Sequence, residues 1–149
     1  MRWRISRALL ARLQAEARAA GGRETCGLLV GGDGLIREAV SAPNVAPDPA
    51  IAFEIDPGLY LRTQRAARDR GLRILGHYHS HPGGDPRPSV HDAARAEQVG
   101  VLWLILAGNE AALWTAGREG LHGRFVSTPF EIVGEPPCKD AGERPIGGA

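Results

Sequence analysis

Residues 72–82 read LRILGHYHSHP, an apolar segment that runs into three alternating histidines and ends at a proline. Leu72–His79 has the composition of a central β-strand, whereas residues 81–88 hold too many prolines and glycines for regular structure. A short helix is predicted to begin at Ser89, and Val101–Ala107 is the most apolar strand of the chain. This succession of strand, loop, helix and strand indicates a mixed α/β fold.

The N-terminal part of the chain predicts a helix followed by a hairpin. Residues 1–20 are rich in arginine, as some targeting peptides are, but they lack a separate apolar core and a cleavage site. Thr25–Val30 and Leu35–Val40 are expected to be strands joined by the glycine-rich turn at 31–34. The helix is expected to pack on the core through apolar residues at helical spacing, namely Ile5, Leu9, Leu10, Leu13 and Ala17.

Local signals predict the remaining elements. A short strand is expected at Ala52–Ile55, after a loop that contains three prolines. A helix is expected over residues 56–70, because an aspartate suited to the cap position is followed directly by a proline. Two weaker strands are expected near Ala112–Thr115 and Leu121–Val126.

The chain length sets the number of domains. A chain of 149 residues is long enough for one compact domain with a real core and too short for two. We predict that residues 1–133 form this single α/β domain, with a sheet packed between helices. Residues 134–149 are rich in proline and glycine and are expected to be disordered.

The composition argues against several classes of protein. A net charge of +1 lacks the basic surplus that is typical of nucleic-acid binders. No apolar run approaches the roughly 20 residues that a membrane-spanning helix needs. Two cysteines far apart in the sequence cannot build a disulfide framework. We therefore expect a cytoplasmic globular protein that binds neither nucleic acid nor membrane.

His79 and His81 are the first sign of a metal site. Side chains alternate along an extended segment, so these two imidazoles project to the same face and can converge on one ion. Imidazole nitrogen suits zinc at about 2.0–2.1 Å. The pair alone is weak evidence, because two histidines at this spacing also occur without a metal.

Asp92 is the candidate for the third ligand. It lies in the first turn of the helix after the proline- and glycine-rich loop, from where its carboxylate can return to the histidine pair. Two histidines and one carboxylate leave a coordination position open, as in catalytic zinc sites. An alternative is that Ser89 and Asp92 form a capping box that only satisfies the helix end. That alternative does not account for the histidines.

Glu24 is the candidate for the general base that a hydrolytic site needs, because the attacking water must lose a proton that is then passed to the leaving group. It stands directly before an apolar strand, where a surface carboxylate is the ordinary explanation. Nothing in the sequence alone brings Glu24 beside the histidines.

Three segments together resemble the JAMM/MPN+ metalloprotease family. Its pattern is a glutamate, a distant H-[ST]-H-P motif and a later S-x-x-D motif. This chain has Glu24 in ETCGLL, then HSHP at residues 79–82, then SVHD at residues 89–92. Every motif position is filled in the expected order, and the resemblance extends from about Ser6 to Val126.

The resemblance implies a role for each motif residue and a fold. His79, His81 and Asp92 would bind Zn²⁺, and Glu24 would act as general base and then as general acid. Ser89 would stabilise the oxyanion formed when water attacks a carbonyl. The family's fold, a sheet sandwiched between helices as in the cytidine deaminases, agrees with the α/β prediction.

His77 departs from the family pattern, since relatives commonly carry tryptophan or another bulky residue there. It shares the face of His79 and His81 by alternation, so the sequence leaves open a supporting or alternative ligand as well as an ordinary packed histidine. Of the other reactive or aromatic residues, the sequence predicts an exposed His91, core positions for Cys26, Trp103 and Trp114, and no partner for His122 or Cys138.

The resemblance also implies a substrate class. We expect a peptidase or isopeptidase that hydrolyses the amide after the C-terminal Gly-Gly of a ubiquitin-like or sulfur-carrier protein. The chain's own last residues, Gly147-Gly148-Ala149, are similar to such a tail, although a glycine-rich disordered end is the simpler explanation. A non-catalytic MPN-type scaffold and a structural zinc site are the alternatives, and the sequence leaves homodimer formation open.

Overall fold

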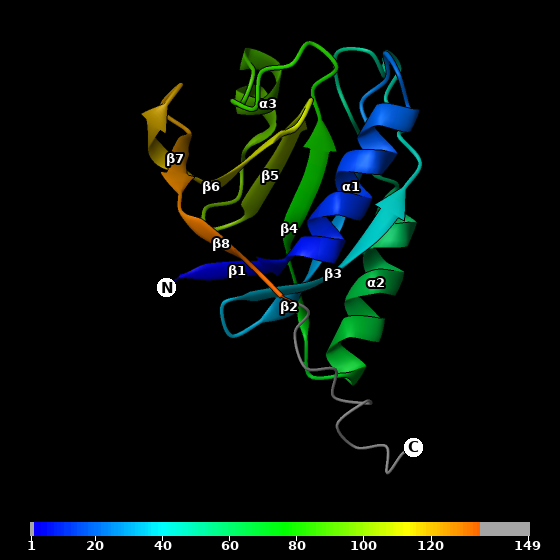
Figure 1. The fold of residues 1–149 in the computed structure, drawn as a ribbon, viewed down its shortest axis with the longest axis vertical. Helices are drawn as coiled ribbons and strands as arrows, with labels where there is room; N and C mark the ends of the chain where they lie inside the picture. Colours follow the sequence, from blue (N-terminus) through cyan, green and yellow to red (C-terminus); the bar gives the residue numbers. More distant parts are fainter. Residues whose placement is uncertain (1, 135–149) are drawn as a thin grey trace.

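The computed structural model describes residues 2–134 and is drawn in Figure 1. Eight strands and three helices lie within this part of the chain. In chain order they are β1 (Trp3–Ser6), α1 (Arg7–Ala19), β2 (Cys26–Gly32), β3 (Leu35–Ala42), α2 (Pro57–Asp69), β4 (Arg73–Ser80), α3 (Val90–Arg95), β5 (Leu102–Ala107), β6 (Glu110–Leu121), β7 (Phe125–Thr128) and β8 (Phe130–Val133).

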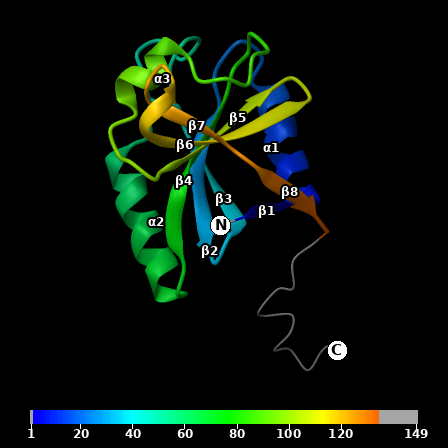
Figure 2. The same cartoon turned by 90° about the vertical axis from the view of Figure 1, so that its left-hand side faces the viewer.

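All eight strands form one mixed sheet, in the order β7-β6-β5-β4-β2-β3-β1-β8. The central strand β4 pairs antiparallel with β2 and parallel with β5. Helices α1 and α2 lie on opposite faces of the sheet, with β4, β2 and β3 between them (Figure 2). The predicted fold, a sheet packed between helices, is therefore confirmed. None of the helices in the described range is long and apolar enough to cross a membrane.

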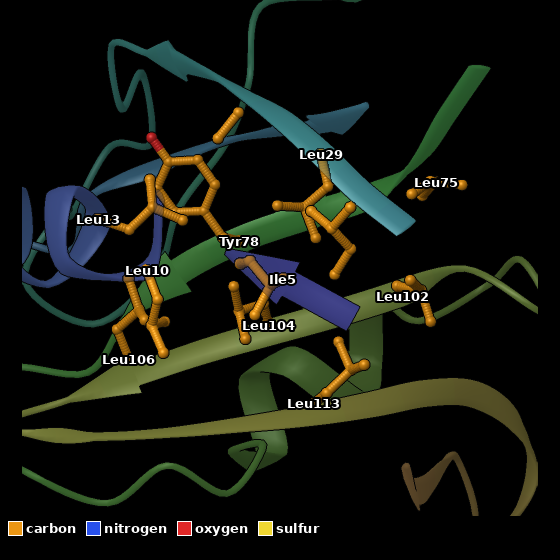
Figure 3. Close-up of a cluster of buried hydrophobic side chains, with 12 residues drawn as sticks. Ile5, Leu10, Leu13, Leu29, Leu75, Tyr78, Leu102, Leu104, Leu106 and Leu113 are labelled. Carbon is orange, nitrogen blue, oxygen red and sulfur yellow. The ribbon is translucent and has the colours of Figure 1, made fainter. Parts of the chain in front are cut away.

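Side-chain alternation divides the core into two parts. On β5, Leu104 and Leu106 point into the cluster beneath α1, whereas Trp103 points to the other face. On β4, Tyr78 joins the α1 cluster, so its neighbours His77 and His79 face away from α1. Figure 3 shows this apolar cluster around Leu13, Leu29 and Tyr78. His77 and His79 thus belong to the face of the sheet opposite to α1.

Two helix starts follow from the capping residues. The Ser6 side chain accepts a hydrogen bond from the backbone N–H of Leu9 at 3.0 Å, which begins α1. Asp56 accepts from the backbone N–H of Leu59 at 3.2 Å, and Pro57 occupies the first position of α2 as predicted.

Three expectations about secondary structure need correction, and one strand was missed. Ile5 does not belong to the N-terminal helix, because Trp3–Ser6 pairs with β8 and β3 as a strand that buries Ile5 completely. Residues 52–55 are not a strand; Phe53 packs against ring side chains of β4 instead. Of the two weak strands, the one near 112–115 extends over the whole of β6 to Leu121, and the one near 121–126 begins only at Phe125 as β7. The strand β8 was not predicted. Almost all of the tail predicted to be disordered, residues 135–149, lies outside the described residues.

Candidate metal centre

His79 and His81 lie at the end of β4 and Asp92 lies in α3, and their side chains converge. Figure 1 shows α3 close to the end of β4. The Nε2 atoms of the two histidines are 3.0 Å apart. Oδ2 of Asp92 lies 3.2 Å from Nε2 of His79 and 3.1 Å from Nε2 of His81. A tetrahedral ion with bonds of 2.0–2.2 Å separates its ligand atoms by about 3.3–3.6 Å. The three donor atoms therefore fit zinc with small adjustments.

The hydrogen bonding of His81 selects the tautomer that a metal ligand needs. Its Nδ1 lies 2.7 Å from the backbone carbonyl of Asp85, and a carbonyl only accepts, so Nδ1 carries the proton. The lone pair of Nε2 then points to the convergent cluster. A ligating histidine usually donates its other N–H in this way, which orients the ring and raises its basicity.

Packing orients the ring of His79, because its Nδ1 has no hydrogen-bond partner within residues 2–134. Its ring is fully buried and stacks on Phe53, with the ring centroids 4.4 Å apart and the planes 20° from parallel. Trp103 meets it edge-on at 5.7 Å. Burial lowers the pKa of His79, which keeps its imidazole in the neutral form that binds metals.

The geometry of Asp92 is compatible with both roles that the sequence left open. The backbone N–H of Asp92 donates to the Ser89 hydroxyl at 3.1 Å, and the backbone N–H of Ser89 donates to Oδ2 of Asp92 at 2.9 Å. This capping box begins α3 and aims the same oxygen at both histidines. Burial alone would raise the pKa of Asp92, but its hydrogen bonds with His79 and His81 hold it well below the usual range. Asp92 is thus a charged carboxylate.

Glu24 joins this cluster because of the register between β2 and β4. Cys26 pairs with His79 across the two antiparallel strands, so the residues before Cys26 run alongside those after His79. The Ser80 backbone N–H donates to the Thr25 carbonyl at 3.0 Å, and the Thr25 N–H donates to the Ser80 hydroxyl at 2.8 Å. These contacts bring Glu24 beside His79 and His81, as the resemblance had implied and no local pattern could.

The Glu24 carboxyl is buried and close to both histidines. It is 6% exposed, and its oxygen and one ring nitrogen each of His79 and His81 lie within 4.8 Å of one another. Burial raises the pKa of Glu24 to about 7, with His81 acting against the rise and Asp92 adding to it. Its Oε1 is buried without a hydrogen-bond partner among the residues that the structure describes. A carboxyl that titrates near neutral pH and is free to accept a proton suits a general base.

Residues 6–117 match the family of prokaryotic homologs of the JAB domain. This range covers about three quarters of the 149 residues. The chain belongs to the prokaryotic JAB family. Its motif order and sheet agree with the resemblance drawn from the sequence.

Two named proteins are similar in sequence to this JAB domain. A desampylase of Haloferax volcanii is 38% identical over 84 residues, covering 55% of this chain and 60% of the relative. A probable TtuB-protein conjugate cleaving protease of Thermus thermophilus is 35% identical over 85 residues, covering 56% and 57%. The match therefore spans less than two thirds of either relative. Among solved structures, DSY2949 of Desulfitobacterium hafniense is 26% identical with a TM-score of 0.75, covering 89% of this chain and 93% of that one.

Sequence patterns missed the residues that hold the loop of the JAB domain between His81 and Ser89. The indole N–H of Trp114 donates to the carbonyl of Pro86 at 3.1 Å. Nε2 of His122, a residue without an expected partner, lies 3.0 Å from the carbonyl of Pro88. Both residues come from the distant region of β6 and the turn after it, so no local signal could reveal these contacts.

The remaining sequence expectations agree with the structure where it describes them. Cys26 and Trp103 are buried core residues, and burial raises the pKa of the Cys26 thiol to about 12. Trp114 is partly buried against the same cluster, and His91 is exposed. Cys138 lies outside the described residues.

Replacing Ser89 separates the helix cap seen in the structure from the oxyanion role that the resemblance implies. Because its hydroxyl oxygen accepts the Asp92 N–H, the hydroxyl proton is free for a substrate oxyanion. Ser89→Ala is expected to lower kcat by about 10²–10³, the usual cost of a lost oxyanion donor. Loss of the cap adds about 1 kcal/mol of destabilisation, measurable by urea unfolding. A normal kcat with only the stability loss would reduce Ser89 to a helix cap.

Proposed function

We propose that this JAB domain is a zinc-dependent isopeptidase that releases a small ubiquitin-like protein by hydrolysing the amide at its C-terminus. The observation that carries the proposal is the convergence of His79, His81 and Asp92 beside the buried Glu24. Two imidazoles and a carboxylate suit zinc better than magnesium or calcium, which prefer oxygen ligands. The names of the two relatives, a desampylase and a conjugate-cleaving protease, support the same class of activity.

The protein groups have separate tasks in this reaction. A zinc ion held by His79, His81 and Asp92 would supply Lewis acidity at the reacting centre. Glu24 takes a proton from the attacking water and returns it to the leaving amine, which requires a pKa near the working pH. The Ser89 hydroxyl donates to the oxyanion that develops on the attacked carbonyl. Low exposure of Glu24 and Asp92 keeps the charges of these two carboxylates in a medium where they interact strongly.

The alternatives of a scaffold or a structural zinc site explain less of this geometry. A structural zinc usually has four protein ligands, whereas three side chains contact one another here and Glu24 makes no hydrogen bond to them. A scaffold has no need of a buried carboxyl with an unpaired oxygen, which destabilises the fold. Catalysis accounts for both the cluster of three ligands and the buried, unpaired carboxyl oxygen of Glu24.

The substrate we propose is a ubiquitin-like or sulfur-carrier protein that ends in Gly-Gly. The bond to be cut must reach a deeply buried cluster, and glycine permits the close approach of backbone that a side chain would block. A fusion of such a carrier to a short peptide after Gly-Gly should be cut at that junction. Valine in place of the second glycine should lower turnover steeply. Equal cleavage of the valine form would contradict the Gly-Gly specificity.

Metal content is the first measurement. The purified protein is expected to contain about one zinc per chain by elemental analysis, and a chelator should abolish cleavage of the fusion. Restoring zinc should restore activity. A protein that takes up no transition metal after zinc reconstitution would contradict the proposed function at its base.

A further inference from the structure

A cavity of about 550 Å³ lies next to the metal centre, on the side of the sheet away from α1. Its walls come from α2, from β4 and from the segment between α3 and β5 (Figure 2). Most of the lining is apolar or aromatic. The principal side chains are Phe53, Ile55, Tyr60, Ile74, Val101 and Trp103.

The cavity and the metal centre share a wall. Phe53 stacks on His79 with centroids 4.4 Å apart and lies 5.2 Å from the ring of His77, which lines the cavity. His77 and His79 are two residues apart on β4, a rise of about 6.5–7 Å. An extended peptide bound at the metal therefore reaches the cavity within two or three of its residues.

His77 is a polar group without a partner in this apolar wall. Its Nδ1 is buried and unpaired, and neither ring nitrogen has a hydrogen bond within residues 2–134. A neutral imidazole has one donor and one acceptor, and leaving them unpaired is costly. An extended peptide backbone offers groups that match both.

The charged residues at the rim argue against an anionic ligand. The guanidinium of Arg95 donates to the carbonyl of Phe53 at 2.7 Å and lies 3.7 Å from the Glu54 carboxylate. The other charged lining residue, Glu97, is an acid. The cavity thus suits an uncharged, apolar segment of chain.

We propose that this cavity binds an apolar side chain of the carrier protein's tail, a few residues before the scissile bond, with His77 as a specificity-determining residue that hydrogen-bonds to the tail. The inference rests on the proposed function. The carrier is the constant partner in every conjugate, whereas the protein attached to it varies. A preformed pocket beside the metal centre can recognise the carrier in all of these conjugates, but it cannot fit attached proteins of varying sequence.

Binding of product peptides to the full-length protein tests the proposal without any turnover. The probes are seven-residue peptides that end in Gly-Gly with a free carboxylate and carry serines elsewhere. A single leucine is moved through the three positions before Gly-Gly. One position is expected to bind about 10- to 100-fold more tightly than the all-serine peptide, because burial of leucine is worth that much. The NMR signals of the His77 ring and the Trp103 indole should shift.

Three variants assign the effect to the cavity. His77→Phe keeps a ring and removes an unpaired buried nitrogen, so the fold should remain intact; it should weaken the leucine peptide about 3- to 10-fold. Leu61→Glu, at the cavity and 53% exposed, should also weaken binding. Val126→Glu, which is 41% exposed on β7 and lines no part of the cavity, should not.

The outcomes separate this inference from the proposed function. Equal binding of all peptides, or equal affinity of His77→Phe and wild type for the leucine peptide, would overturn the cavity assignment while fusion cleavage could still occur. A second peptide set continues beyond Gly-Gly and carries its leucine there; tighter binding of that set alone would assign the cavity to the attached protein instead and overturn the carrier assignment. Leucine-dependent binding without hydrolysis of any fusion would uphold the cavity and count against the enzyme.

Discussion

Glu24→Gln is expected to abolish hydrolysis while the protein keeps its zinc. The amide has nearly the shape of the carboxylate but cannot accept a proton from water, and general-base catalysis is worth about 10²–10⁴ in rate. Burial gives this carboxyl a pKa of about 7, so the wild type has a base that is available at neutral pH. The measurement is kcat on the carrier fusion, with zinc content determined on the same sample.

A matched control shows whether the effect belongs to position 24 or to any exchange of glutamate for glutamine. Glu119→Gln changes the same group at an exposed site on β6 and should leave kcat and zinc content unchanged. The Glu24 variant should be about as stable as wild type, since an uncharged amide of nearly the same shape replaces a buried ionisable carboxyl. Turnover near that of wild type in Glu24→Gln would exclude Glu24 as the base.

Local patterns were sufficient for the parts of the site that lie on one continuous segment. His79 and His81 share a face because side chains alternate, and Asp92 follows from a capping box that the structure contains. The start of α2 at Pro57 follows equally from its own residues. In each case the decisive interaction joins residues fewer than about fifteen positions apart.

The failures all concern contacts between distant segments. Ile5 has helical spacing with Leu9 and Leu13, yet pairing with β8 and β3 makes its segment a strand. The position of Glu24 depends on the register of Cys26 with His79, which no short window of sequence contains. Such pairings are decided by the burial of whole strands, so tertiary packing overrides local preference.

Asp92→Asn is expected to lower the affinity for zinc by more than about 100-fold, beyond the 10–100-fold that changes around metal ligands usually cost. The asparagine oxygen can still accept the N–H of Ser89, so α3 should keep its cap and the fold should persist. Competition with a chromophoric chelator measures the affinity. Asp85→Asn is the control, because the bond to His81 comes from the Asp85 backbone carbonyl and its side chain is exposed.

The two substitutions together decide which carboxylate is the ligand and which is the base. Glu24 also comes within 4.8 Å of both histidines, so it is the competing candidate for the third ligand. Asp92 lies nearer, at 3.1–3.2 Å, and hydrogen bonds keep it ionised, whereas Glu24 has an unpaired oxygen and a pKa near neutrality. These differences predict zinc loss with Asp92→Asn alone. Zinc retained in Asp92→Asn but lost in Glu24→Gln would exchange the two roles, and the hydrolytic mechanism would then need another base.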